Sequence, residues 1–129
     1  MTEGIERITT AALSLALDAS AMRQQAIAAN IANADVPGYQ PVTVDFESQL
    51  DTAQRALDEG GRLDMDMLAD VSPRIVNETQ LQPTDLAPHV TLDMQMAQLA
   101  QNGVQFQALT TALNKQFALM SLAVNDGKR

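Results

Sequence analysis

The sequence predicts a mainly all-α protein in which two long terminal helices form an elongated antiparallel, coiled-coil-like hairpin. Apolar residues make up 46% of the 129 positions, but aromatic residues make up only 3%. Ala, Leu, Met and Val dominate the apolar content, which is typical of packed helices rather than of sheets. Both ends of the chain also carry apolar residues at alternating steps of three and four, the pattern of a helical seam.

Charge divides this single structural domain into three parts, residues 1–35, 36–90 and 91–129. The middle part holds ten acids and three bases, whereas the two ends are nearly neutral, and the whole chain carries a net charge of −8. Neutral apolar ends usually bury against other surfaces, and a charged middle usually meets water. An acidic chain without clustered bases is not expected to bind nucleic acid.

The first long helix is expected from Glu3 to Asn33. Its seam toward the last helix follows unbroken three-and-four steps through Ile5, Ile8, Ala12, Leu15, Ala19, Met22, Ala26, Ala29 and Asn33. A second apolar set falls on the opposite side of the same heptads and comprises Leu13, Leu17, Ile27 and Ile31. A helix with one partner does not need a second stripe, so this set is predicted to be an assembly face that touches a neighbouring protein.

The first helix is expected to stop near Asp35, because a proline biases the preceding Val36 away from helical backbone. The four residues Val36-Pro37-Gly38-Tyr39 fit a type II turn. Proline presets φ at the second position of such a turn, and glycine supplies the positive φ at the third.

The middle of the chain is expected to hold a short amphipathic helix from Phe46 to Leu57, with Asp45 at its start and Gly60-Gly61 at its end. Residues 62–90 are predicted to be loop-rich with at most a β-hairpin. The segment Arg74–Val76 could form a strand, but prolines interrupt the region at Pro73, Pro83 and Pro88.

The last helix is expected from Leu92 to Val124, with Thr91 as N-cap and Asp126-Gly127 as the stop. Its seam comprises Leu92, Met96, Leu99, Gly103, Phe106, Thr110, Leu113, Phe117, Met120 and Val124. Two helices of this length in so short a chain favour an elongated shape and assembly packing over a compact globule.

The sequence offers no catalytic, cofactor-binding or metal-binding constellation, so we expect no enzyme activity and no cofactor. His89 is the only histidine, and it follows a proline in a loop. The acids Asp64, Asp66 and Asp70 lack the glycine and distal glutamate of a calcium loop, and a solvated acidic face explains them better. The sequence contains no run of about 18 apolar residues, so it predicts no membrane span. Met1–Arg7 lacks the features of a cleavable signal peptide.

Residues 28–39 resemble the N-terminal motif shared by flagellar rod, hook and hook–filament junction proteins. The matching positions are Asn30, Ala32, Asn33, Pro37, Gly38 and Tyr39. Val36 departs from the usual threonine or serine. The segments Val44–Phe46, Leu92–Ala100 and Phe106–Thr110 are similar, more specifically, to proximal rod proteins of the flagella basal body rod protein family.

This resemblance implies a structural subunit of the proximal rod in the bacterial flagellar basal body, which polymerises into the axial drive shaft for motility. It implies other flagellar rod proteins and the adaptor FliE as partners. It also implies passage through the flagellar type III export apparatus, without a cleaved signal peptide, to the rod in the periplasmic space. A soluble helical adaptor or export chaperone is the alternative from another class, and a longer neighbouring rod protein is the alternative within the class.

Overall fold

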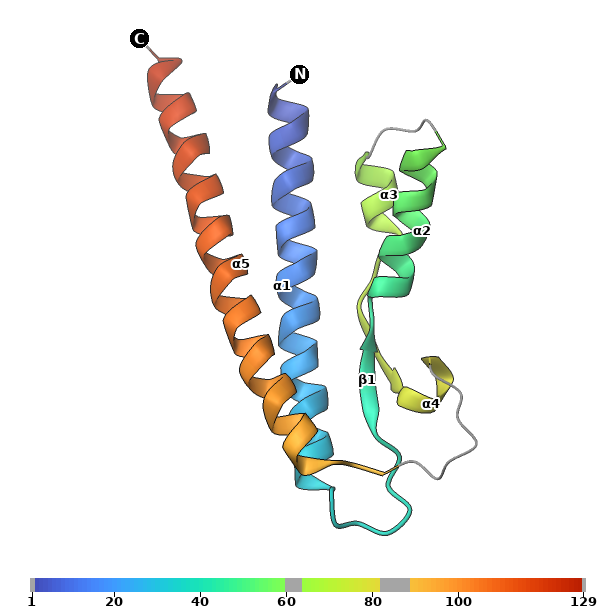
Figure 1. Ribbon diagram of the computed structural model, residues 1–129. Coiled ribbons are helices and arrows are strands. Elements are labelled where there is room, and N and C mark those ends of the chain that lie inside the picture. Colours follow the sequence, from blue (N-terminus) through green and yellow to red (C-terminus); the bar gives the residue numbers. More distant parts are fainter. Residues whose placement is uncertain (1, 60–63, 82–88, 129) are drawn as a thin grey trace.

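The computed structural model describes residues 2–59, 64–81 and 89–128, and it is mainly helical with a small two-stranded sheet in the middle of the chain (Figure 1). This confirms the predicted fold class. In chain order the elements are α1 (Thr2–Ala32), β1 (Val42–Asp45), α2 (Glu47–Asp58), α3 (Met65–Ala69), β2 (Arg74–Asn77), α4 (Glu78–Leu81) and α5 (Leu92–Asp126).

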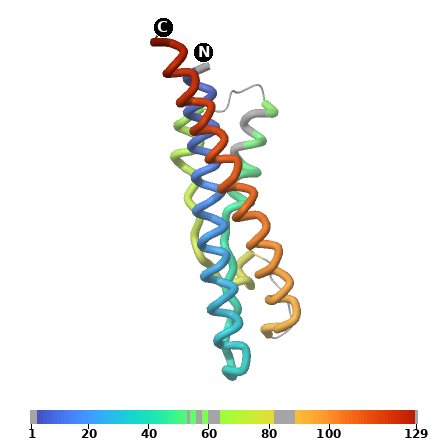
Figure 2. The backbone as a smooth tube through the Cα atoms, turned by 90° about the vertical axis from the view of Figure 1, so that its left-hand side faces the viewer, coloured from blue at the N-terminus to red at the C-terminus, as the bar shows by residue number. Residues whose placement is uncertain are grey.

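The two terminal helices run antiparallel along the length of the molecule, and both chain ends lie at the same end of it (Figure 1). Helix α1 has 31 residues and α5 has 35, so each is roughly 45–55 Å long at 1.5 Å per residue. Thr91 occupies the expected N-cap position of α5, although its side chain makes no capping hydrogen bond. The view turned by 90° shows the same elongated pair (Figure 2).

Helix α1 lies between α5 on one side and the middle segment on the other (Figure 1). The hydrophobic core forms on the middle-segment side, where Ala19 and Ala26 of α1 pack with Val44, Phe46 and Val71. Leu15, Met22 and Val42 pack against this cluster. The small alanine side chains allow the strand to approach the helix closely, so the core is narrow. The face of α1 that was expected to meet α5 therefore covers the middle segment.

The sheet consists of β1 and β2, which pair antiparallel with Val42 opposite Asn77 and Asp45 opposite Arg74. The strand expected at Arg74–Val76 is present as β2. Its partner lies outside residues 62–90, however, and α2 and α3 intervene, so the two strands do not form a tight hairpin. Four residues of β1 are too short a run for alternation to identify a strand from the sequence.

The predicted turn after α1 is present. Gly38 adopts a φ of 76°, and the Tyr39 N–H donates to the Val36 carbonyl at 3.2 Å. An added Cβ on Gly38 would meet no atom within 4 Å, so only the backbone conformation calls for glycine here.

We expect Gly38→Ala to lower the free energy of unfolding by about 1 kcal/mol, because an L-residue is strained at this positive φ. Gly103→Ala is the matched control. Gly103 is helical, and a Cβ there also meets no atom within 4 Å, so this change should stabilise the chain by about 0.5–1 kcal/mol. Urea unfolding followed by circular dichroism measures both. Equal effects of the two substitutions would contradict the turn assignment.

Short helices occupy parts of the middle that were expected to be loops. Asp64 caps α3 by accepting a hydrogen bond from the Met67 N–H at 3.0 Å, and Leu68 and Val71 supply buried apolar contacts nearby. Helix α2 begins one residue after the expected start, following the buried Phe46. Its expected stop at Gly60-Gly61 lies outside the described residues, as do Pro83 and Pro88.

Candidate assembly site

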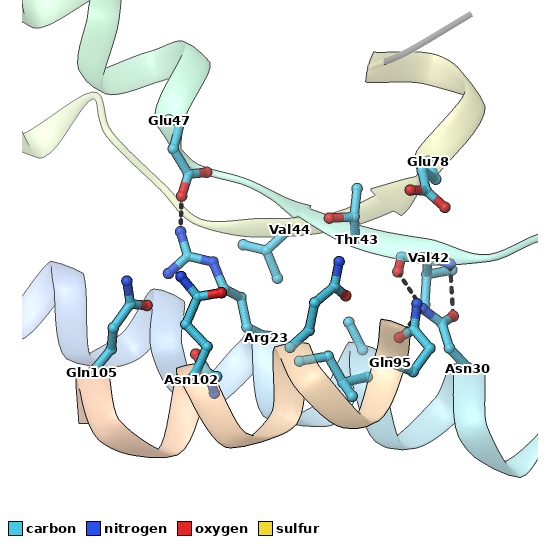
Figure 3. A pocket seen from close by; sticks show the side chains of 14 residues that line it. Arg23, Asn30, Val42, Thr43, Val44, Glu47, Glu78, Gln95, Asn102 and Gln105 are labelled. Atoms are coloured by element: carbon cyan, nitrogen blue, oxygen red, sulfur yellow. Dashed lines mark hydrogen bonds and ion pairs between the residues drawn. The ribbon is translucent and has the colours of Figure 1, made fainter. Parts of the chain in front are cut away.

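The motif residue Asn30 connects three elements where α1 ends and the chain turns (Figure 3). Its side chain is 3% exposed and donates to the Val42 carbonyl at 2.9 Å and to Gln95 Oε1 at 3.2 Å. Its Oδ1 accepts from the Val42 N–H at 2.9 Å and from the Tyr39 hydroxyl at 3.0 Å. One side chain thus binds the turn, the start of β1 and the start of α5.

The chemistry of this cluster explains why asparagine stands at position 30. A primary amide offers one acceptor oxygen and two donor hydrogens. Asn30 therefore presents to Val42 the same donor and acceptor pair that a neighbouring strand would present. The second motif asparagine, Asn33, has a local role and donates from its side chain to the Ala29 carbonyl at 2.8 Å. Pro37 and Gly38 are exposed, and they form the turn that returns the chain to β1.

A second buried polar cluster joins α1 to α5 two helical turns farther along α5. The Ser20 hydroxyl donates to Asn102 Oδ1 at 3.0 Å, and Asn102 Nδ2 donates to the Ser20 carbonyl at 2.9 Å. Asn102 Nδ2 also donates to Gln24 Oε1 at 3.0 Å. Ser20 and Asn102 are buried, so these bonds satisfy groups that would otherwise be costly to remove from water.

These contacts define the side of α5 that faces α1. Gln95 and Asn102 are seven residues apart, and at the far end the Thr10 hydroxyl contacts Met120 Sδ at 3.8 Å. Steps of three and four join these positions into one line. It comprises Gln95, Leu99, Asn102, Phe106, Leu109, Leu113, Gln116 and Met120. Leu99, Phe106, Leu113 and Met120 belong to both this line and the predicted seam.

Much of the predicted α5 seam lies at the edge of the contact with α1 or beside it, and several of its large side chains are exposed to solvent. These exposed residues form one flank of the helix, and we call them the α5 stripe. The α5 stripe comprises Leu92, Met96, Phe117 and Val124. The predicted seam is rotated about the axis of α5 relative to the observed contact with α1. The reason is that the prediction selected apolar positions, whereas the structure buries the polar Gln95 and Asn102 with hydrogen-bond partners.

The second apolar stripe of α1 also differs from the expectation. Helical spacing places Leu13, Leu17, Ile27 and Ile31 on the same line as Thr10, Ser20 and Gln24, which bond to α5. Ile27 is only 6% exposed, and the other three are half-buried. The stripe expected to point away from the helix pair therefore faces α5. The physical reason is that α1 has two partners within the chain, one on each apolar face.

Asp45, the last residue of β1, is a buried carboxylate in the middle segment. The Ser48 hydroxyl donates to its Oδ1, and Arg74 Nη2 donates to its Oδ2 at 3.0 Å. The hydrogen bond from Ser48, followed by the interaction with Arg74, lowers the pKa of Asp45 below its usual value of 3.8, although burial opposes this shift. The carboxylate thus links the end of β1 to α2 and β2.

This network predicts an acid-dependent contribution to stability. Because the pKa of Asp45 is lower in the folded chain, its contribution is present above the unfolded-state pKa near 4 and is lost as the pH falls through the folded-state pKa. We expect the stability difference between the parent and Asp45→Asn to be largest above about pH 5 and to shrink below about pH 4. Urea unfolding at a series of pH values measures it. A difference that is constant from pH 7 to pH 3 would contradict the assignment.

A polar groove lies between α1, β1 and the first half of α5, with a volume of about 310 Å³ (Figure 3). Asn30 and Gln95 border it, and Gln98, Gln101, Asn102 and Gln105 of α5 line one side. Arg23 of α1 and Glu47 of α2 form an ion pair at its margin. We call this feature the amide groove.

The acidic residues and the histidine considered as candidate metal-binding or catalytic residues do not form a cluster in the described part of the chain. Asp64, Asp66 and Asp70 are exposed, and within the described ranges no three His, Cys, Asp or Glu side chains are grouped so as to hold a metal ion. His89 is exposed as well. None of the helices in the described part of the chain is long and apolar enough to cross a membrane.

A family model for flagella basal body rod proteins matches residues 12–40. The matched segment contains most of α1, the polar contacts at Ser20 and Asn30, and the turn at Gly38. The matched segment therefore places the chain in the class of structural proteins of the flagellar rod.

Curated relatives match most of the chain. The flagellar basal body rod protein FlgB of Escherichia coli (strain K12) is 32% identical, over 87% of this chain and 89% of the relative. FlgB of Proteus mirabilis (strain HI4320) is 31% identical, over 81% and 85%. FlgB of Bacillus subtilis (strain 168) is 30% identical, over 90% and 92%. The chain belongs to the FlgB family of flagellar basal body rod proteins.

Proposed function

We propose that this chain is a structural subunit of the proximal flagellar rod that polymerises with other rod proteins through the α5 stripe. The observation that carries the proposal is a set of large apolar side chains on α5 that are exposed to solvent. They lie beside the contact between α1 and α5, which buried hydrogen bonds already hold together. Met96 is 52% exposed and Phe117 is 50% exposed. Large apolar side chains that are exposed along one helix usually mark a protein interface.

The spacing of the α5 stripe suits a helical partner. Its members, Leu92, Met96, Phe117 and Val124, occupy positions of one three-and-four repeat along the helix. Burying one such side chain contributes roughly 1.5–3 kcal/mol, so several buried together are sufficient to drive association. Ile5 is 62% exposed, but the other large apolar residues of α1 are at least partly buried, which leaves the stripe on α5 as the stronger candidate for the assembly face.

Three finer features of the proposal rest on the motif and family resemblance. The adaptor FliE and other rod proteins are the proposed neighbours. The proposed route is the flagellar type III export apparatus, without removal of a signal peptide, to the part of the rod in the periplasmic space.

Electron microscopy of purified basal bodies tests the proposal, with a tagged copy of the chain replacing the native one. We expect the tag at the base of the rod, and we expect cells that lack the chain to form no rod beyond that level. Intact mass measurement of the incorporated protein should match the uncleaved chain. A tag found only in the cytoplasmic fraction, with rods of normal length in cells that lack the chain, would favour the soluble adaptor instead.

A further inference from the structure

Two lines of residues on α5 have the spacing to pack against α1. The line that faces α1 in the structure and the predicted apolar seam share Leu99, Phe106, Leu113 and Met120. They differ at their other positions, where the observed line includes Gln95, Asn102 and Gln116 and the seam includes Met96, Gly103 and Phe117. A small roll of α5 about its own axis would exchange one line for the other. Such a roll would turn the α5 stripe toward α1.

Apolar packing alone does not select the line that the structure uses. The hydrophobic effect is non-directional and grows with the apolar area that is buried. The seam is the more apolar of the two lines, since Met96 and Phe117 stand beside the Gln95 and Gln116 of the observed line. The buried residues of α5 are nevertheless polar, and they are Gln95 and Asn102. A directional interaction must therefore hold α5 in its observed rotation.

The side chain of Asn102 supplies such an interaction. It is 4% exposed, and its Nδ2 donates to the Ser20 carbonyl at 2.9 Å and to Gln24 Oε1 at 3.0 Å. Its Oδ1 accepts from the Ser20 hydroxyl at 3.0 Å. These three bonds require position 102 to point at α1, because hydrogen bonds weaken steeply away from good geometry. In coiled coils, one buried asparagine sets the register of paired helices in the same way, at a cost in stability. Asn102 lines the amide groove together with Gln95 (Figure 3).

We propose that Asn102 is a positioning residue that fixes the rotation of α5 about its axis and thereby keeps the α5 stripe turned outward. Its hydrogen bonds hold the less apolar line against α1, so the more apolar residues remain available to a neighbouring rod subunit. Without these bonds α5 rolls, the seam packs on α1, and the stripe is withdrawn from the surface. The role in assembly rests on the proposed function, because the stripe is the proposed contact. The rotation itself is a property of the free chain.

Cysteine labelling of the purified monomer measures the rotation of α5. The chain has no cysteine, so a single one can be placed at either of two reporter positions. Gly103 is exposed and belongs only to the seam, and Gln116 is half-buried and belongs only to the observed line. We expect Gly103→Cys to react with a maleimide about tenfold faster than Gln116→Cys. Adding Asn102→Ala should reverse this order. Adding Asn114→Ala removes the same amide from an exposed position of α5 and should leave both rates within about twofold.

Incorporation into purified basal bodies gives a second measurement, made on the chain without added cysteines. Asn102→Ala should lower incorporation by about fivefold or more, because only the fraction of chains with an outward stripe can assemble. Asn102→Leu combined with Ser20→Ala replaces both polar partners and makes the observed line more apolar, a change that can be nearly neutral for stability. This double variant should recover the labelling order and the incorporation of the parent.

The labelling results decide the inference independently of assembly. An unchanged order in Asn102→Ala, or an equal rise of both rates, would overturn it, since Asn102 would then contribute stability without setting the rotation. A reversed order with normal incorporation would support the rotation and contradict the proposed role of the α5 stripe. Failure of this inference and failure of the proposed function therefore give different results.

Discussion

Asn30→Ala should lower the free energy of unfolding by about 3 kcal/mol or more. The substitution removes four hydrogen bonds and leaves the Val42 N–H and C=O, the Tyr39 hydroxyl and Gln95 without their partner. Each buried polar group that loses its partner costs roughly 1–3 kcal/mol, and water entering the site recovers part of that sum. The loss is large for a chain whose core contains few buried apolar side chains.

Asn33→Ala is the matched control, because it removes the same side chain from the next motif asparagine. Asn33 makes one local bond to the Ala29 carbonyl, which also accepts from the Asn33 backbone N–H. This variant should therefore lose about 1 kcal/mol or less. Urea unfolding of the purified chains, followed by circular dichroism, measures both effects. Equal losses from the two substitutions would show that Asn30 does not join the three elements in solution.

Phe117→Lys should leave synthesis and export of the chain intact and reduce its incorporation into the basal body at least tenfold. Phe117 is half exposed, so the folded monomer tolerates a lysine there. Phe117 is already half buried, so assembly would add about half of the roughly 1.5–3 kcal/mol of full burial, and Phe117→Lys would lose that half. The substitution would also force a lysine charge out of water, and the two costs together reach about 1.4 kcal/mol, which corresponds to a factor of ten. Quantitative immunoblotting of purified basal bodies measures incorporation.

Two further variants separate the possible causes of such a defect. Thr111→Lys places the same charge on an exposed position of α5 away from the stripe, and it should incorporate at least half as well as the parent. Leu17→Lys places the charge between α1 and α5, so it should reduce the stability of the monomer itself. Normal incorporation of Phe117→Lys would remove the α5 stripe from the assembly interface. Loss of incorporation with Thr111→Lys as well would mean that the effect is not specific to the stripe.

The bounds of the main elements were predictable because local signals specify them. The Pro37-Gly38 pair forms the turn that follows α1, which ends at Ala32, shortly before the expected stop near Asp35. Thr91 precedes the first residue of α5, and Gly127 follows its last. The positive φ of Gly38 was predictable for the same reason, since a type II turn requires it at that position. The short strand β1 was not predictable, because its four residues form a strand only where β2 and Asn30 supply hydrogen bonds.

The faces of the helices depended on contacts that are distant in the sequence. Periodicity identified two apolar lines on α1 but could not assign a partner to either, because residues 42–46 were not recognised as a packing surface. On α5, the predicted apolar seam and the line of residues that faces α1 share Leu99, Phe106, Leu113 and Met120. The spacing of seven residues between Gln95 and Asn102 was the signal that could have identified the side of α5 that faces α1.

By itself, the sequence determined that this protein is an elongated helical chain with apolar ends, an acidic middle and a rod-protein motif. Composition, periodicity and turn residues are local properties, so they can be evaluated without knowing where the chain folds back. Only the tertiary structure decided which side of α5 meets α1 and which side remains open. The physical reason is that Asn30 and Asn102 are stable in the interior only when Val42, Gln95, Ser20 and Gln24 are in place to bond them.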